Sequence, residues 1–116
     1  IKSKYMRQFM TSVVEQRKDF TGSFSTHPIE VGWAREAIFF ITVEECHGRG
    51  ALLKAKVQIS VDGVYWLDEG TAFDPIDSRG QYFVRVSHFG GWLRLSGEIE
   101  GKEGKFNLTI HLVIKE

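Results

Sequence analysis

The sequence predicts an all-β protein, an antiparallel β-sandwich or jelly-roll of seven or eight strands preceded by an N-terminal arm. Residues 53–61 alternate apolar and polar side chains and run into Asp62-Gly63, a pair typical of hairpin turns. Residues 106–115 alternate in the same way, and Val113 is the one departure. From residue 20 onward, Gly-rich turns separate short apolar segments with no helix between them, which favours a sandwich over a parallel βαβ fold.

Length and composition fit one packed domain. The chain has 116 residues, too few for two independent cores, with 42% hydrophobic and 13% aromatic residues. Twelve Gly against two Pro suit many tight turns. We expect residues 20–116 to form the sandwich domain and residues 1–19 to form the arm.

The arm is ambiguous in conformation. Its apolar side chains recur every four residues, in two series: Tyr5, Phe9 and Val13, and Met6, Met10 and Val14. That spacing is helical, whereas residues 11–14 suit an extended strand equally well. In either conformation Tyr5, Met6, Phe9 and Met10 are candidate contacts with the domain itself or with a neighbouring subunit.

The strands follow from alternation and from the turn residues between them. In order, the expected strands are residues 20–26, 29–33, 37–46, 53–61, 64–69, 81–87, 92–100 and 106–115. Pro28 cannot donate a ladder hydrogen bond and so predicts an edge position for the second of these. Gly-rich turns are expected at residues 48–50 and 101–104.

Several side chains are expected inside the sandwich. They are Phe39, Ile41 and Val43, then Phe73 and Ile76 beneath the loop 70–80, and Phe106, Leu108, Ile110, Leu112 and Ile114 on the last strand.

Charge and cysteine content exclude several classes of function. Fifteen basic and fifteen acidic residues argue against nucleic acid as the main partner. No apolar run approaches the roughly 18 residues of a membrane helix. Cys46 is the one cysteine, so an internal disulfide is impossible, which favours an intracellular or virion protein.

No pattern of catalytic or metal-binding residues stands out. Glu44 and Glu45 are neighbours on a strand and diverge, and the loop acids match no calcium-binding template. The four histidines lack metal-ligand spacing, and nucleophile-elbow, Walker and dinucleotide motifs are absent. We therefore expect no enzyme, no catalytic residues, no cofactor and no metal.

Aromatic side chains are the remaining candidates for ligand binding. Trp33, Tyr65, Tyr82 and Trp92 could stack on the apolar faces of sugars. Alternatively, Trp66 and Trp92 close the core near the turns.

Three segments carry a resemblance to a known group. Residues 57–66 (VQISVDGVYW), residues 91–95 (GWLRL) and residues 106–115 together resemble small β-sandwich structural proteins of tailed phages and prophages. This resemblance implies a capsid-decorating, head-completion or tail-accessory role. The turn at residues 60–66 is also similar to the hairpin of discoidin-like binding modules and to the Asp-box hairpin of sialidases. In those hairpins Ser and Asp cap the bend and Gly supplies a positive φ.

The sequence thus predicts a non-enzymatic structural or assembly protein, a component of a phage or phage-like particle. It would form homo-oligomers and contact other particle proteins through the arm and one sheet face, in the virion or the cytoplasm, without nucleic acid or membrane. The alternative is a carbohydrate-binding module that uses the exposed aromatics to hold a glycan.

Overall fold

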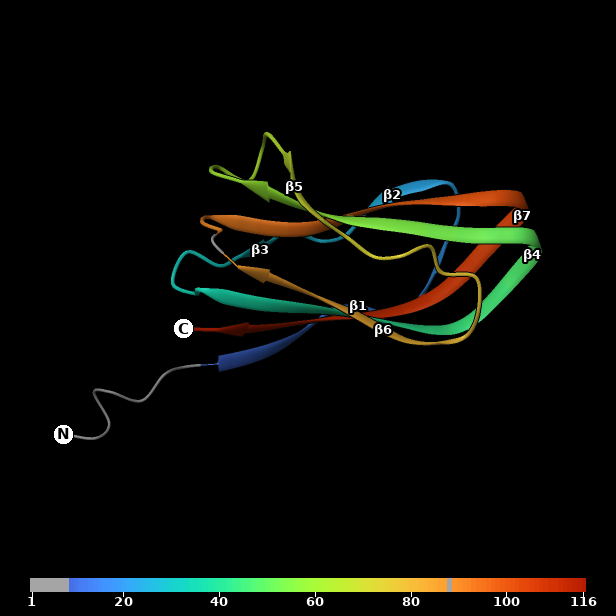
Figure 1. Cartoon of the computed structure of the whole chain (residues 1–116), viewed down its shortest axis with the longest axis horizontal. Helices are drawn as coiled ribbons and strands as arrows, with labels where there is room; N and C mark the ends of the chain where they lie inside the picture. The colour runs from blue at the N-terminus through green and yellow to red at the C-terminus, as the bar shows by residue number, and fades with distance from the viewer. Residues whose placement is uncertain (1–8, 88) are drawn as a thin grey trace.

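The computed structural model describes residues 9–87 and 89–116, which contain seven antiparallel strands and no helix. This confirms the predicted all-β sandwich. The strands are β1 (Phe9–Phe20), β2 (Ser23–Ser25), β3 (Ile29–Glu30), β4 (Glu36–Ser60), β5 (Leu67–Ala72), β6 (Gly80–Ser87) and β7 (Trp92–Lys115) (Figure 1).

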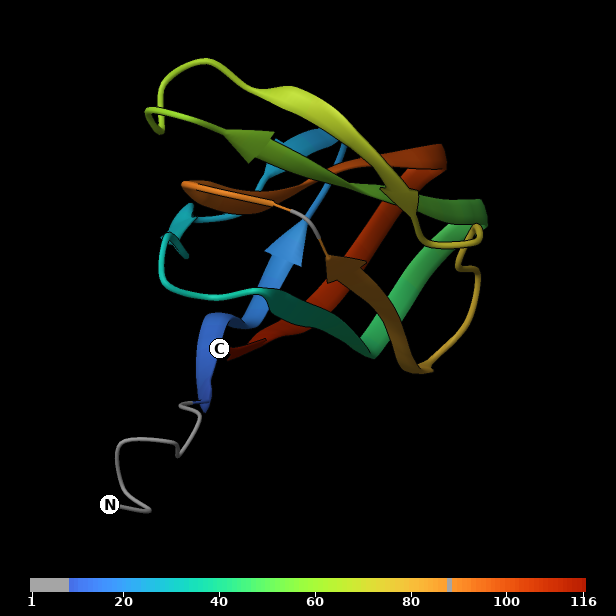
Figure 2. The ribbon, with the colours of Figure 1, turned by 60° about the vertical axis from the view of Figure 1, so that its left-hand side comes forward.

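Two long strands, β4 and β7, form the frame of the molecule. They pair antiparallel from Glu36 opposite Lys115 to Ser60 opposite Trp92. Midway they bend together, so that a single sheet folds onto itself into two layers (Figures 1 and 2). The β1–β6 layer contains β1, the C-terminal half of β7, the N-terminal half of β4, and β6. The β2–β5 layer contains β2, β3, the remaining halves of β7 and β4, and β5.

The glycine-rich segments 48–50 and 101–104 are not turns between strands, as the sequence suggested, but the shared bend of β4 and β7. Gly48 and Gly101 have φ angles of 107° and 105°, which favour glycine. A Cβ on Gly101 would lie 2.7 Å from the carbonyl oxygen of Gly50. The glycines therefore let the two backbones approach closely, and the chain bends without leaving the sheet.

The core lies between the layers and confirms the predicted inward residues. Each of the following is at most 7% exposed: Phe39, Ile41, Val43, Phe73, Ile76, Phe106, Leu108, Ile110, Leu112 and Ile114. Leu53, Ala55 and Val57 are buried as expected, whereas Val61, which continues their alternation, is 90% exposed because β4 ends at Ser60.

The described part of the N-terminal segment is extended rather than helical. Residues 9–20 form β1, which pairs with β7 from Phe9 opposite Lys115 to Phe20 opposite Phe106. The apolar side chains that repeat at helical spacing are thus spread over both faces of a strand. Tyr5 and Met6 lie outside the described residues.

The strand expected at residues 20–26 is interrupted. β1 ends at Phe20, Gly22 takes a φ of 62°, and β2 begins at Ser23 in the other layer. The rings of Phe20 and Phe24 lie 4.3 Å apart. The chain therefore crosses between the layers at this glycine.

The predicted hairpin is present, but its turn is wider than the expected Asp-Gly turn. Ile59 pairs with Leu67, so residues 61–66 form the connection. Ser60 Oγ accepts hydrogen bonds from the backbone N–H groups of Asp62 and Gly63 at 3.2 and 2.8 Å. These side-chain bonds replace the pairing that a two-residue turn would make.

Candidate interaction surfaces

The outward face of the β1–β6 layer carries apolar side chains on all four strands. Residues directly opposite each other in a ladder project to the same side of a sheet. One row across the layer is Val13, His111, Phe40 and Phe83, and the next is Thr11, Val113, Ile38 and Arg85. We call Phe9, Val13, Ile38, Phe40, Phe83 and Val113 the outer apolar face.

This face is open to solvent in the described chain. Phe9 is 71% exposed, Val13 54% and Phe83 49%, while the other members are half-buried. The rings of Phe40 and Phe83 lie 5.9 Å apart, and the Arg85 guanidinium lies 5.0 Å from the Phe83 centroid. A group of exposed apolar side chains on one sheet face marks an interaction surface more often than a lone exposed side chain does.

One end of the outer apolar face is hollowed. A depression of about 270 Å³ lies there, with Ile38 and Val113 among its lining residues and Glu36, Arg85 and Lys115 as its charged groups. The outer apolar face is therefore concave at this end, and both acidic and basic side chains line the depression.

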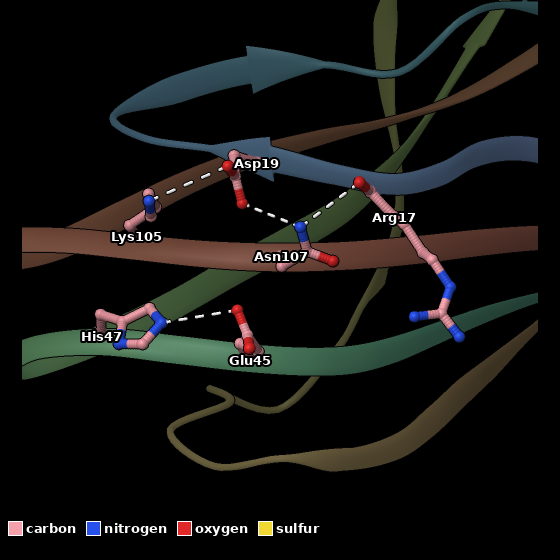
Figure 3. A network of polar contacts seen from close by, with 6 residues as sticks. All are labelled: Arg17, Asp19, Glu45, His47, Lys105 and Asn107. Atoms are coloured by element: carbon pink, nitrogen blue, oxygen red, sulfur yellow. Dashed lines mark hydrogen bonds and ion pairs between the residues drawn. The ribbon is translucent and has the colours of Figure 1, made fainter.

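The opposite end of the same face is polar. Asn107 Nδ2 donates to Asp19 Oδ1 at 2.8 Å and to the Arg17 carbonyl at 3.3 Å (Figure 3). Lys105 lies 3.8 Å from Asp19, and His47 lies 3.7 Å from Glu45. The contacts of Asn107 and Lys105 join β1 to β7, whereas the His47–Glu45 contact lies within β4, and together they border the apolar region on the side of the bend.

The edge strand β1 is held unevenly along its length. In its second half, Thr109 Oγ1 accepts the Arg17 N–H at 3.1 Å and donates to Glu44 Oε2 at 2.8 Å. Two register shifts, between Val13 and Glu15 and between Glu15 and Lys18, distort this half. Residues 9–13 pair regularly with β7, and their other edge faces no strand of the described chain.

The connection 61–66 forms a rigid, apolar tip at the open end of the sandwich. Asp62 Oδ1 accepts the N–H groups of Val64 and Tyr65 at 2.8 and 3.0 Å and a bond from Ser60 Oγ at 2.9 Å. These hydrogen bonds hold the pKa of Asp62 below its usual 3.8, and the bond from the Val64 N–H has the largest effect. Val64 and Tyr65 nevertheless point outward, 69% and 79% exposed. The expectation that Ser and Asp cap this bend is confirmed.

The four candidate sugar-stacking residues occupy different surroundings. Tyr65 lies on the exposed tip. Trp92 is half-buried, and its ring lies close to Gly63 of the tip, where a Cβ would be 3.1 Å from the ring. Trp33 is 39% exposed in the β3–β4 connection. Tyr82 belongs to the other layer, opposite Ile41, and its hydroxyl donates to the Ser78 carbonyl at 2.9 Å. The structure therefore does not gather the four rings on one platform.

Polar groups elsewhere are engaged with one another. Asp68 accepts hydrogen bonds from Gln58 and Lys56, both at 3.0 Å, which lower its pKa below 3.8. The Arg94 guanidinium lies 4.3 Å from the Trp66 centroid, and its Nε donates to Gln58. Among residues 9–87 and 89–116, no three His, Cys, Asp or Glu side chains converge as a metal site would require. Over the same residues, no helix is long and apolar enough to cross a membrane.

The sequence reasoning missed most of the outer apolar face. It singled out Phe9 from the arm but assigned no role to Ile38, Phe40 or Val113. Two signals were available: residues 37–41 are apolar without alternation, and Val113 breaks the alternation of the last strand. Both signals mark apolar side chains on the outer side of a strand whose other side faces the core.

Comparison with known proteins supports the fold. The chain is similar to the SPBc2 prophage-derived protein YomS, with 12% identity over 96% of both chains and a TM-score of 0.57. A chain in the structure of infectious bursal disease virus, Gx strain, gives a TM-score of 0.58 at 9% identity, and that of the Gt strain gives 0.55 at 9%. The match spans 94% of this chain but 32% of each viral chain. No protein-family model and no curated protein sequence matches the chain. At these identities the likeness establishes a shared fold.

Proposed function

We propose that this protein is a non-enzymatic structural component of a phage or phage-like particle and that it associates with copies of itself and with other particle proteins. The observation that carries the proposal is the outer apolar face, where a sheet surface exposed to solvent bears aliphatic and aromatic side chains on all four strands. Burial of such a surface between subunits stabilises an assembly through the hydrophobic effect.

The particle role rests on two weaker supports. The sequence segments that resemble phage structural proteins lie in β4, its following loop and β7, which are the frame of the fold. The same fold occurs in YomS, a prophage-derived protein, and in a chain of a virus structure. Decoration, head completion and tail accessory functions all fit a small sandwich that binds through one face.

The test is the oligomeric state of the protein and of two matched variants, measured by size-exclusion chromatography with light scattering over a range of concentrations. Phe83→Ser removes an aromatic ring from the outer apolar face. Tyr65→Ser removes one from the loop tip, and both rings are exposed in the described chain. We expect the unmodified protein and Tyr65→Ser to self-associate and Phe83→Ser to shift toward the monomer.

A protein that is monomeric at every concentration would argue against assembly through this face. Equal loss of association in both variants would argue against the outer apolar face in particular. The genes beside this one supply an independent check, because capsid or tail genes there would support a particle role.

A further inference from the structure

Edge strands of natural β-sheets usually carry features that prevent pairing with other chains, such as charges, proline, bulges or short length. Most edge strands of the described chain carry such features, but one part of β1 does not. β2 and β3 span three and two residues and are separated by Pro28, and β5 carries Asp68 and Glu69. β6 presents Arg85 on its exposed side.

Residues 9–13 of β1 carry no charge, proline or bulge, and they belong to a strand of 12 residues. The segment Phe-Met-Thr-Ser-Val contains no charge and no proline, and the bulges of β1 begin only after Val13. Its backbone is held in regular pairing with β7 on one side, so it is already extended and needs little ordering to accept another strand. On the other side it meets no strand of the described chain.

We propose that this segment pairs antiparallel with the same segment of a second copy, around a two-fold axis at Thr11. This inference rests on the proposed self-association and names its geometry. In that register Phe9 lies opposite the partner's Val13, Met10 lies opposite the partner's Ser12, and Thr11 lies opposite its own counterpart.

The register is self-complementary. Phe9, Thr11 and Val13 lie opposite Lys115, Val113 and His111 and therefore project to the outer side. Across the axis, an aromatic ring meets a β-branched side chain at both ends, a favourable cross-strand pair, and no like charges oppose one another. The outer apolar faces of the two copies then become continuous in one sheet.

The segment is short, about 17 Å at about 3.4 Å per residue. A contact through five residues of each copy is smaller than the roughly 20–30 residues a side of a stable interface. We therefore expect a dimer that dissociates on dilution and serves as a building unit of a larger assembly.

The experiment is disulfide trapping, in full-length protein that carries Cys46→Ser so that no other thiol is present. Directly opposite residues in an antiparallel pair have Cα atoms about 4.5–5.5 Å apart, within the range of about 4.4–6.8 Å that a disulfide spans. Thr11→Cys, at an exposed position, is expected to give a covalent dimer under mild oxidation. Gln16→Cys, exposed on the same strand inside the second register shift, is the control and is expected to give none.

The register is tested by mixing two single-cysteine proteins. Phe9→Cys and Val13→Cys are each expected to remain mostly uncrosslinked alone, because equivalent residues would lie about 13 Å apart at about 3.3 Å per residue. Mixed together, they are expected to crosslink.

The outcomes separate this inference from the proposed function. If the protein oligomerises in solution but Thr11→Cys gives no more dimer than Gln16→Cys, the two-fold pairing is wrong and assembly through the outer apolar face stands. Crosslinking of Phe9→Cys with itself would overturn the register. A protein that is monomeric at all concentrations contradicts both proposals.

Discussion

Ile38 of β4 lies directly opposite Val113 of β7, and both side chains are on the solvent side of the β1–β6 layer. Their neighbours along the two strands, Ala37 and Ile114, pair on the core side and are at most 1% exposed. At this position the two central strands of the layer are therefore apolar on both faces. One face forms the core, and the other is available to a second protein.

This arrangement predicts that Val113 and Ile114 differ sharply in their effect on stability. Ile114→Ala should lower the free energy of unfolding by about 2–5 kcal/mol, because it leaves a cavity in the core. Val113→Thr should change it by less than about 1 kcal/mol and should instead weaken self-association. Urea unfolding at low protein concentration and light scattering measure the two effects. A large loss of stability in Val113→Thr would contradict the outward orientation of Val113.

The loop tip should loosen at acidic pH. The pKa of Asp62 is lowered from 3.8 by the N–H groups of Val64 and Tyr65, so folding favours the ionised carboxylate. Its stabilising effect is present above pH 3.8 and is lost as the pH falls through the lowered pKa of the folded state. In an NMR titration, the amide resonances of Val64 and Tyr65 should shift with a midpoint below 3.8. In Asp62→Asn this pH-dependent shift should disappear. If it remained, another group would be responsible for the titration and the prediction would be wrong.

Gly97 should be essential to the packing of the β2–β5 layer. A Cβ there would overlap the ring of Phe24, which lies against the core. Gly97→Ala should therefore cost about 1–3 kcal/mol by overpacking. Gly32→Ala is a matched control, because nothing lies within 4 Å of the added Cβ. Thermal unfolding of both variants checks the difference, and equal midpoints would mean that Phe24 moves aside freely.

Thr109 should be needed to hold the bulged half of β1. Its hydroxyl is buried and bonds both the Arg17 N–H and Glu44. Thr109→Val removes this hydroxyl, so that the Arg17 N–H and the Glu44 carboxylate both lose a hydrogen-bond partner, and it should cost about 1–3 kcal/mol. Thr42→Val, which removes an exposed bond to Gln81 on the same face, should cost less. Hydrogen exchange should be faster in residues 15–20 of Thr109→Val, and an unchanged pattern would argue against this anchoring role.

Much of the fold could be predicted from local patterns. The alternation of Phe106, Leu108 and Ile110 follows from the period of two that a half-buried strand imposes, and these residues are fully buried. Ser60 and Asp62 cap the bend as their side-chain chemistry suggests. In each case the determining interaction lies within a few residues of the chain.

Other features could not be predicted in this way. The glycines at 48 and 101 look like turns in the sequence, yet they bend two strands that remain paired. Whether a glycine ends a strand or bends it depends on a partner strand distant in sequence. The same holds for the segment before Phe20, where pairing with β7 selects the strand over the helix.

The sequence by itself determined the all-β class, most of the buried face of each long strand and the capped bend at Asp62, because these depend on side-chain period and local hydrogen bonds. The tertiary structure alone decided that β4 and β7 fold together into two layers, that Ile38 and Val113 meet on the outside, and that residues 9–13 are left at an open edge. These depend on which strands become neighbours. That choice is made by contacts between distant parts of the chain, which no short stretch of sequence contains.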